Sequence, residues 1–171
     1  MNPEEVQHYV VEPGRLLAGE YPGSWEPELA ARRLRFLIGR GVETFIDLTT
    51  DDDRLEAYEP LFDDLGDGLR RLSFPIPDMG VPESEDVMSS VLEAIRAENG
   101  VGRVCYVHCW GGIGRTGTVV GCYFRQQGMG GVEALGRVQE LYSKGMPKVV
   151  RHPRSPQTRA QCDYVQRWGR R

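Results

Sequence analysis

Cys109 and Arg115, within the stretch CYVHCWGGIGRTGT (105–118), are the residues whose types and spacing are best suited to chemistry. The glycines between them permit backbone angles and close approaches that other residues resist. Successive N–H groups at a helix N-terminus form an anion site, and a guanidinium group can hold two oxygens of a phosphate. We therefore expect a phosphate-binding loop composed of Trp110, Gly111, Gly112, Ile113, Gly114 and Arg115.

Cys109 lies at the base of this expected loop. The loop amides, the helix dipole and Arg115 would all stabilise a thiolate, which is the nucleophilic form of cysteine. A thiolate below a bound phosphorus atom is placed for in-line displacement. The pattern therefore predicts a catalytic site.

The loop lies where a buried strand passes into a helix. The segment GRVCYVHC (102–109) carries no charge after Arg103, which favours a central strand covered on both faces. The residues that follow, 116–127, fit a buried helix. In open α/β sheets, ligands bind beyond the carboxyl ends of the strands.

Strands that alternate with helices predict an α/β domain with a central, largely parallel sheet flanked by helices. The length of 171 residues favours a single domain over 1–171. In helix 83–99 we expect Val87, Val91, Leu92 and Ile95 to form the buried stripe. The other expected elements are two short strands in 8–23, strands 42–50 and 70–77, and helices 27–40, 54–65, 131–143 and 156–168.

Composition excludes several classes of function. Hydrophobic residues make up 40% and charged residues 27%, as is usual for a soluble globular chain. No stretch approaches the roughly 18 apolar residues of a membrane span, and the N-terminus lacks a signal sequence, so we expect a cytoplasmic protein. A formal net charge of −4 argues against a general nucleic-acid binder. The segment 51–67 is acidic and the end, 144–171, is basic.

The cysteines, at positions 105, 109, 122 and 162, match no disulfide framework or zinc motif. His108 and Cys109 are adjacent on a strand, so their side chains should point to opposite faces and not converge on one ion. We expect no metal and no cofactor.

The run His108-Cys109, five residues, Arg115-Thr116 resembles the signature of cysteine-dependent protein phosphatases. CWGGIGRTG is most similar to the dual-specificity branch, particularly kinase-associated phosphatases and their bacterial relatives. The resemblance covers about residues 10–168. It implies a metal-independent phosphomonoester hydrolase that acts through a phosphocysteine intermediate.

The resemblance also implies a general acid on a separate loop, because the leaving oxygen must be protonated. Asp78, within the proline-framed segment FPIPDMGVP, is the candidate. Asp51, Asp52 and Asp53 follow another expected strand and are the competing candidates. They lack the proline frame, so we rank them below Asp78.

Four further residues acquire supporting roles from the resemblance. His108 would hydrogen-bond the loop, and Thr116 would hydrogen-bond the sulfur of Cys109. Gln157 and Gln161, in SPQTRAQ, resemble the glutamines that orient the hydrolytic water in tyrosine-specific members. Alternatively, this segment is a plain helix start with Ser155 as its N-cap.

The resemblance points to phosphotyrosine in a protein, with phosphoserine and phosphothreonine as further possibilities. An inositol-phosphate or RNA 5′-phosphatase is the alternative, and a phosphate-binding module without turnover is another. We expect a monomer that needs neither nucleic acid nor a membrane. The candidate contacts for the more highly charged substrates are Lys148, Arg151, His152 and Arg154.

Overall fold

The computed structural model describes residues 6–169. Five strands and five α-helices alternate along most of the chain, and short 3₁₀ segments occupy three connections. The strands are β1 (His8–Glu12), β2 (Leu16–Gly19), β3 (Val42–Asp47), β4 (Arg70–Ser73) and β5 (Val104–His108). The helices are α1 (Pro27–Ile38), α2 (Glu85–Gly100), α3 (Gly114–Gln126), α4 (Gly131–Gly145) and α5 (Arg159–Arg167). The 3₁₀ segments are η1 (Asp51–Asp53), η2 (Glu59–Asp64) and η3 (Pro147–Val150).

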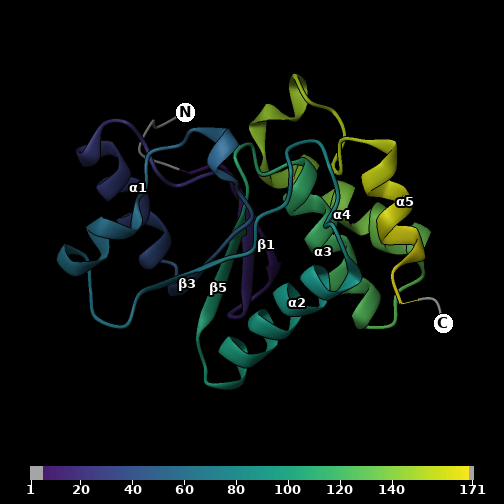
Figure 1. The fold of residues 1–171 in the computed structure, drawn as a ribbon, viewed down its shortest axis with the longest axis horizontal. Coiled ribbons are helices and arrows are strands. Elements are labelled where there is room, and N and C mark those ends of the chain that lie inside the picture. The colour runs from purple at the N-terminus through teal and green to yellow at the C-terminus, as the bar shows by residue number, and fades with distance from the viewer. Residues whose placement is uncertain (1–5, 170–171) are drawn as a thin grey trace.

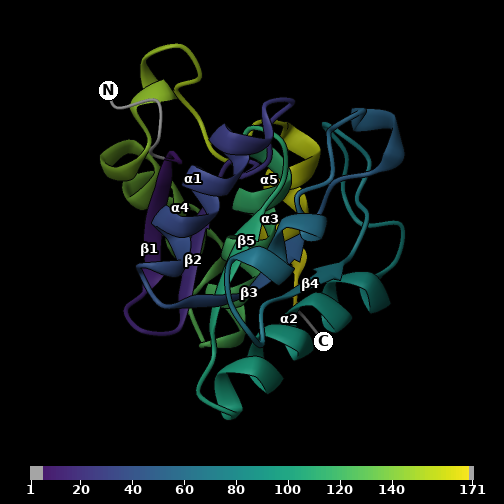
Figure 2. The ribbon, with the colours of Figure 1, turned by 90° about the vertical axis from the view of Figure 1, so that its left-hand side faces the viewer.

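The strands form one sheet in the order β1-β2-β5-β3-β4, with β5 in the centre. Only β1 runs antiparallel to its neighbour, because it is joined to β2 by a tight turn through Pro13 and Gly14. The other three pairs are parallel. This confirms the expected α/β class with a largely parallel sheet, and Figures 1 and 2 show the sheet between two layers of helices.

The two faces of the sheet are covered unequally. One face packs against α1 and η2 through a cluster that includes Phe45 and Tyr106. The other face packs against α2, α3, α4 and α5 through a larger cluster that includes Val107 and Cys109. Alternate residues of β5 therefore enter different cores, as the period of two in a strand requires. Figure 1 shows α1 on one side of the sheet and the four later helices on the other.

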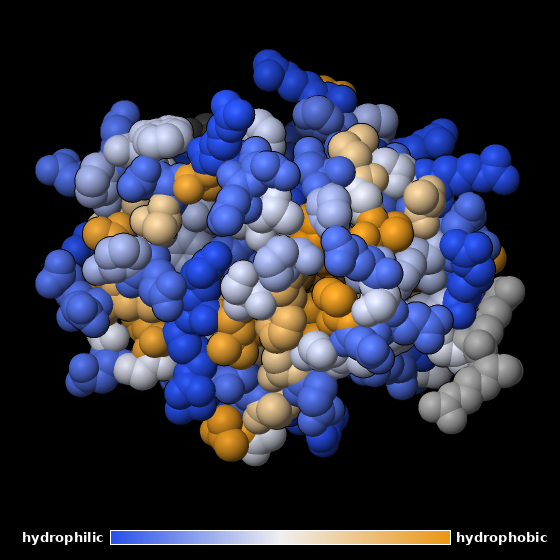
Figure 3. All heavy atoms as spheres, viewed as in Figure 1, coloured by the Kyte–Doolittle hydropathy of each residue, from blue (hydrophilic) through white to orange (hydrophobic). Residues whose placement is uncertain are grey.

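The surface outside these cores is ordinary. Figure 3 shows hydrophilic side chains over most of the face that it presents, with hydrophobic residues in small groups between them. Within residues 6–169, no helix is long and apolar enough to cross a bilayer.

The expected helix over 54–65 is wrong. The chain forms the 3₁₀ segments η1 and η2 instead, joined by irregular backbone. Arg54 has a left-handed φ of 51°, which ends the first segment, and Pro60 cannot donate a backbone hydrogen bond to a continuing helix.

Other differences are smaller. In α2 the buried stripe begins at Met88 instead of Val87, because Met88 has the helical spacing to Val91, Leu92 and Ile95. Three strands are shorter than predicted, because backbone pairing stops earlier. The strands expected over 42–50 and 70–77 end at Asp47 and Ser73, and the one expected over 102–109 is Val104–His108. The last helix begins at Arg159 and not at residue 156.

Candidate active site

The expected phosphate-binding loop connects the end of β5 to the start of α3. Gly112 has a left-handed φ of 71°, and a Cβ atom there would lie 2.3 Å from the backbone carbon of Gly19. A Cβ atom on Gly114 would lie 2.8 Å from a side-chain atom of Gln157. Both positions therefore need glycine, one for its backbone angle and both for the space available.

The carbonyl groups of the loop are held by residues from outside it. The N–H of Tyr21 donates to the Trp110 carbonyl at 2.9 Å. Lys148 Nζ donates to the Gly111 carbonyl at 2.9 Å, and Ser155 Oγ donates to the Ile113 carbonyl at 2.7 Å.

The backbone N–H groups of the same loop are left unpaired. Within the described chain, no hydrogen bond joins the N–H groups of residues 110–113 to an acceptor. They precede the first turn of α3, whose own N–H groups also lack intrahelical partners. Paired carbonyls and unpaired amides are the hydrogen-bonding pattern expected of a loop that binds an anion.

Cys109 lies at the floor of the loop and is 3% exposed. Thr116 Oγ1 donates a hydrogen bond to its sulfur at 3.2 Å, the contact that the resemblance implied. The other cysteines are in different surroundings. Burial raises the pKa of Cys105 to about 12, and it also raises the pKa of Cys122 and of Cys162.

Arg115 is buried beside this floor, and two carboxylates surround it. Both terminal nitrogens donate to the carboxylate of Asp53 at 2.8 Å, in a bidentate pair. Nη1 also donates to the Ile76 carbonyl at 3.2 Å, and Nη2 lies 3.1 Å from Asp78 Oδ1. The Nε atom is buried and has no hydrogen-bond partner in the described chain. The guanidinium therefore has one edge fixed by Asp53 and retains a free donor.

The pairing of Asp53 with Arg115 was not predicted, because these residues lie far apart in the sequence. The N–H and the hydroxyl of Thr50 also donate to Asp53, at 2.8 and 3.2 Å, which holds its carboxylate at the end of η1. Burial disfavours the charged form, but the hydrogen bonds from Arg115 and Thr50 outweigh it, so the pKa of Asp53 is lowered. The pattern Thr50-x-x-Asp53 after a strand is a capping-box signal that could have located this turn but not its partner.

Asp78 lies on the loop that follows β4, and its side chain is 56% exposed. The loop is shaped by a turn in which the Gly80 N–H donates to the Pro77 carbonyl at 3.0 Å. Met79, between these two residues, has a left-handed φ of 57°. The structure thus brings Asp78 to Arg115, as an acid acting at this site would require.

His108 lies on the opposite face of β5 from Cys109, as predicted, and is fully buried. Its Nδ1 lies 3.3 Å from the Cys109 carbonyl, which can only accept, so we assign the proton to Nδ1. Nε2 then accepts from the Tyr58 hydroxyl at 2.8 Å. Burial lowers the pKa of His108 even though Asp47 opposes this shift, so the ring is neutral at neutral pH.

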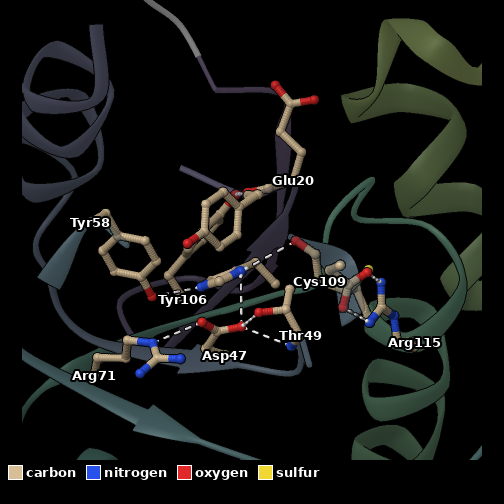
Figure 4. Close-up of polar contacts among 12 residues, drawn as sticks. Glu20, Asp47, Thr49, Tyr58, Arg71, Tyr106, Cys109 and Arg115 are labelled. Carbon is tan, nitrogen blue, oxygen red and sulfur yellow. Dashed lines mark hydrogen bonds and ion pairs between the residues drawn. The ribbon is translucent and has the colours of Figure 1, made fainter. Parts of the chain in front are cut away.

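Asp47 lies at the end of β3, beside this histidine. It accepts hydrogen bonds from the N–H and hydroxyl of Thr49, at 2.8 and 2.7 Å, and from Arg71 Nε at 2.8 Å. Burial alone would raise the pKa of Asp47, but His108 and these hydrogen bonds outweigh burial and lower it. Figure 4 shows Asp47, Thr49, Tyr58 and Arg71 to one side of Cys109 and Arg115. Sequence reasoning missed Asp47, Tyr58 and Arg71, which carry no motif.

Gln157 and Gln161 both reach the phosphate-binding loop at Gly114. Gln161 is buried, and its Oε1 accepts from the N–H groups of Gln157 and Thr158 at 3.1 Å. Its Nε2 donates to the Gly80 carbonyl at 3.0 Å, which ties α5 to the Asp78 loop. Their expected role toward a water molecule stays a prediction.

Ser155 is not the N-cap of the last helix. Its hydroxyl donates to the loop carbonyl of Ile113, and the Ser155–Pro156 peptide bond is cis. Thr158 is the N-cap instead, and its side chain accepts from the Gln161 N–H. The helix begins after Thr158 for that reason.

Lys148 also differs from expectation. Its Nζ is paired with Glu20 in addition to the Gly111 carbonyl, so it is not free to meet a highly charged substrate. Arg151, His152 and Arg154 are exposed. Across residues 6–169, no three His, Cys, Asp or Glu side chains gather as metal ligands would.

Comparisons with known proteins agree with this geometry. A family model described as PTP-SAK, the Swiss Army Knife protein DSP-PTPase phosphatase domain, matches residues 7–164. The chain belongs to this family of dual-specificity and tyrosine phosphatase domains, which confirms the resemblance predicted from the loop.

A curated viral relative is similar over part of its length. It is protein 067L of Invertebrate iridescent virus 3, whose name assigns it provisionally to the tyrosine phosphatases. The two are 30% identical over 113 residues, which are 64% of this chain and 42% of the viral protein. This chain therefore spans about two fifths of the length of that relative.

Solved structures share the fold along nearly the whole chain. Tk-PTP in its active form gives a TM-score of 0.74 at 23% identity, over 95% of both chains. Kinase associated phosphatase with its catalytic cysteine replaced by serine gives 0.74 at 17% identity, over 95% of this chain and 92% of that chain. TpbA of P. aeruginosa gives 0.65 at 25% identity, over 97% and 86%. These likenesses confirm the fold class.

Proposed function

We propose that this protein is a protein-tyrosine or dual-specificity phosphatase that hydrolyses phosphomonoesters through a phosphocysteine. One observation carries the proposal: Cys109 lies on the floor of a loop whose carbonyls are tied outward and whose amides are unpaired. Such a loop binds the oxygens of a phosphate and places phosphorus above the sulfur.

In the first step the Cys109 thiolate attacks phosphorus. An S–P bond forms while the bond from phosphorus to the leaving oxygen breaks, and that oxygen takes a proton from Asp78. The free Nε of Arg115 and the loop amides hold the three equatorial oxygens, over which the negative charge is spread in the transition state.

Asp78 must leave Arg115 before it can act as this acid. Its carboxylate now lies on Nη2, where a phosphate oxygen would bind as well. A bound phosphate dianion repels a carboxylate, so Asp78 would move to the leaving oxygen in its protonated form. Asp53 stays on the other edge of the guanidinium and keeps the fork oriented.

In the second step water hydrolyses the phosphocysteine. Asp78, now a base, takes a proton from the water, a P–O bond forms and the S–P bond breaks. The Thr116 hydroxyl donates to the departing sulfur from its present position. Besides this water, the two steps use only side chains and backbone amides of the chain.

The proposed substrates are phosphorylated proteins, with phosphotyrosine as the main phosphoresidue. The family supports this class of substrate. An inositol-phosphate or RNA 5′-phosphatase is less well supported, because Lys148, the candidate contact nearest the loop, is already ion-paired. We place this activity in the cytoplasm and expect a monomer.

The test is to trap the intermediate. Wild-type protein is mixed with p-nitrophenyl phosphate, quenched in acid within milliseconds to seconds and analysed by mass spectrometry. We expect a phosphoryl group on Cys109 and steady release of phosphate. Cys109→Ser is the control, because its hydroxyl is not ionised at neutral pH, and it should bind phosphate without turnover. Turnover with no phosphorylated Cys109, or near-normal turnover by Cys109→Ser, would remove the nucleophile from the proposal.

A further inference from the structure

A hollow of about 420 Å³ opens beside the phosphate-binding loop, toward α1. Two tryptophans line it: Trp110, which belongs to the loop, and Trp25, which precedes α1. Asp53, Arg33 and Arg54 line it as well. Asp53 also accepts hydrogen bonds from Arg115, so the hollow and the candidate active site share this residue.

Both tryptophans are unusually exposed. Trp25 is 74% exposed and Trp110 is 57% exposed, which makes them the most prominent aromatic side chains at the surface of the described chain. Large aromatic side chains left in water around a concave site are typical of binding surfaces, where their burial contributes much of the affinity. Two of them on one hollow indicate a ligand with an apolar part.

The hollow is built from segments bonded to one another. The Tyr21 N–H donates to the Trp110 carbonyl at 2.9 Å, which anchors the Trp25 segment directly on the phosphate-binding loop. The Tyr21 hydroxyl donates to the Glu56 carbonyl at 2.8 Å and so attaches the segment after η1. Arg33 Nη1 donates to the Gly23 carbonyl at 3.3 Å. The two tryptophans are therefore displayed on a fixed frame.

The charge that remains in the hollow is positive. Of the acidic residues lining it, Asp53 is neutralised by Arg115 and Glu20 by Lys148, which leaves Glu56. Arg54 makes no ion pair within residues 6–169. Its backbone is in the left-handed conformation, with a φ of 51°, which costs free energy in a residue other than glycine. The Nε of Arg33 is buried there and has no hydrogen-bond partner in the described chain.

We propose that this hollow binds the residues next to the phosphotyrosine of a protein substrate. An apolar side chain of the substrate packs against Trp25 and Trp110, and an acidic side chain meets Arg33 and Arg54. The proposal rests on the proposed function and adds sequence preference to it. Trp25 and Arg54 are specificity-determining residues that act outside the bond-breaking steps.

An RNA bearing a 5′-phosphate could also stack on tryptophans, but the observations favour a peptide. An RNA backbone brings a phosphate with every nucleotide, whereas the hollow offers two arginines beside Glu56. A peptide with one apolar and one acidic neighbour matches two tryptophans and a small positive excess.

The experiment compares three substrates in wild-type protein and three variants. The substrates are p-nitrophenyl phosphate, which has no neighbouring residues to bind in the hollow, and two phosphotyrosyl peptides. In one peptide leucine and aspartate flank the phosphotyrosine, and in the other glycine and serine do. The variants are Trp25→Ala, Arg54→Asn, which keeps a residue that tolerates the left-handed conformation, and Val101→Ala. Val101 is 68% exposed and is the C-cap of α2, before the start of β5, whereas the loop follows the end of that strand, so it is the matched control.

The measured quantity is kcat/KM for each peptide divided by kcat/KM for p-nitrophenyl phosphate. We expect Trp25→Ala to lower this ratio about tenfold for the leucine–aspartate peptide. Arg54→Asn should remove most of the preference for that peptide over the glycine–serine peptide, and Val101→Ala should change neither ratio. An unchanged ratio in Trp25→Ala, or equal losses on all three substrates, overturns the proposal.

A second arm adds a 5′-phosphorylated RNA. If Trp25→Ala lowers hydrolysis of the RNA selectively while the peptide ratio stays constant, the hollow is a nucleic-acid site and the proposal is wrong. Failure of the proposed function has a different signature. In that case wild-type protein hydrolyses p-nitrophenyl phosphate but neither peptide, before any variant is compared.

Discussion

Two groups of polar and ionisable side chains lie on either side of β5, the strand that ends just before Cys109, and they differ in how completely they are paired. Behind the strand, Asp47 accepts hydrogen bonds from Thr49 and Arg71, and His108 bonds to the Cys109 carbonyl and to Tyr58. Each of these contacts is internal and largely buried.

The group in front of the strand is open. Arg115 keeps an unpaired Nε donor, and one of its two carboxylate partners, Asp78, is more than half exposed. Both groups contain an arginine that is paired with an aspartate. The difference teaches that a closed network fixes geometry, whereas a network with an unpaired donor and an exposed carboxylate still has groups available to a ligand.

Arg115→Lys should have the largest effect among changes to these two groups. An ammonium group cannot keep the bidentate bond to Asp53 and also offer a donor to phosphate. We expect kcat for p-nitrophenyl phosphate to fall about 10³-fold, with the fold retained by circular dichroism. Arg96→Lys, at an exposed position on α2, is the control and should be neutral. If Arg115→Lys keeps most of its activity, Arg115 has a structural role only, like the residues of the Asp47 group behind the strand.

Asp78→Asn should slow the hydrolysis of phenyl phosphate about 100-fold, because the phenolate leaves without a proton. The loss should shrink for p-nitrophenyl phosphate, whose leaving group is a stable anion. Rates are measured against pH for both substrates, and the alkaline limb, which needs protonated Asp78, should flatten in the variant. Equal losses on both substrates with an unchanged alkaline limb would exclude Asp78 and return attention to Asp51 and Asp52, since Asp53 is committed to Arg115.

Asp53→Asn tests whether the buried carboxylate orients Arg115. An amide can accept from only one of the two guanidinium nitrogens, so the fork should become loose, and we expect kcat/KM for p-nitrophenyl phosphate to fall about tenfold. Asp52→Asn is the matched control, since Asp52 is the exposed neighbour in the same 3₁₀ segment. The same loss in both variants would mean that only the charge of the segment matters.

His108→Gln should have the smallest effect of these changes. The quantity affected is the pH dependence of the free energy of unfolding. The pKa of His108 is lowered in the folded protein, so the unfolded chain binds a proton that the folded one does not as pH falls below about 6.5. The wild-type protein should therefore lose up to about 1.4 kcal/mol of unfolding free energy through this group between about pH 7.5 and pH 5.5. Urea unfolding at both pH values gives this difference, which should be absent in His108→Gln and present in His152→Gln. A wild-type loss that persists in His108→Gln would assign it to other groups.

The sequence predicts the fold and the centre of the site because these depend on local patterns. The uncharged strand before Cys109, the glycines of the loop and the proline-framed Asp78 all lie within short segments, and each is where the pattern placed it. A strand followed by a glycine-rich turn and a helix has few ways to fold.

Ion pairs between residues that lie far apart in the sequence could not be predicted in the same way. Asp53 lies in an acidic run that resembles a solvated surface, and only the packing of the β3 and β5 ends brings it to Arg115. Lys148 resembles a free surface cation until the fold places Glu20 beside it. The sequence shows that Asp53 and Lys148 are charged, but it does not show which residue of opposite charge pairs with each of them.

Three carbonyls of the phosphate-binding loop are held by Tyr21, Lys148 and Ser155, which lie far to either side of the loop in the sequence. A chain still being synthesised contains Cys109 well before it contains Lys148 and Ser155. Until those residues arrive, two of the three loop carbonyls lack the partners that hold them in the folded domain. The order of synthesis therefore delays the formation of this loop until nearly the whole domain can fold around it.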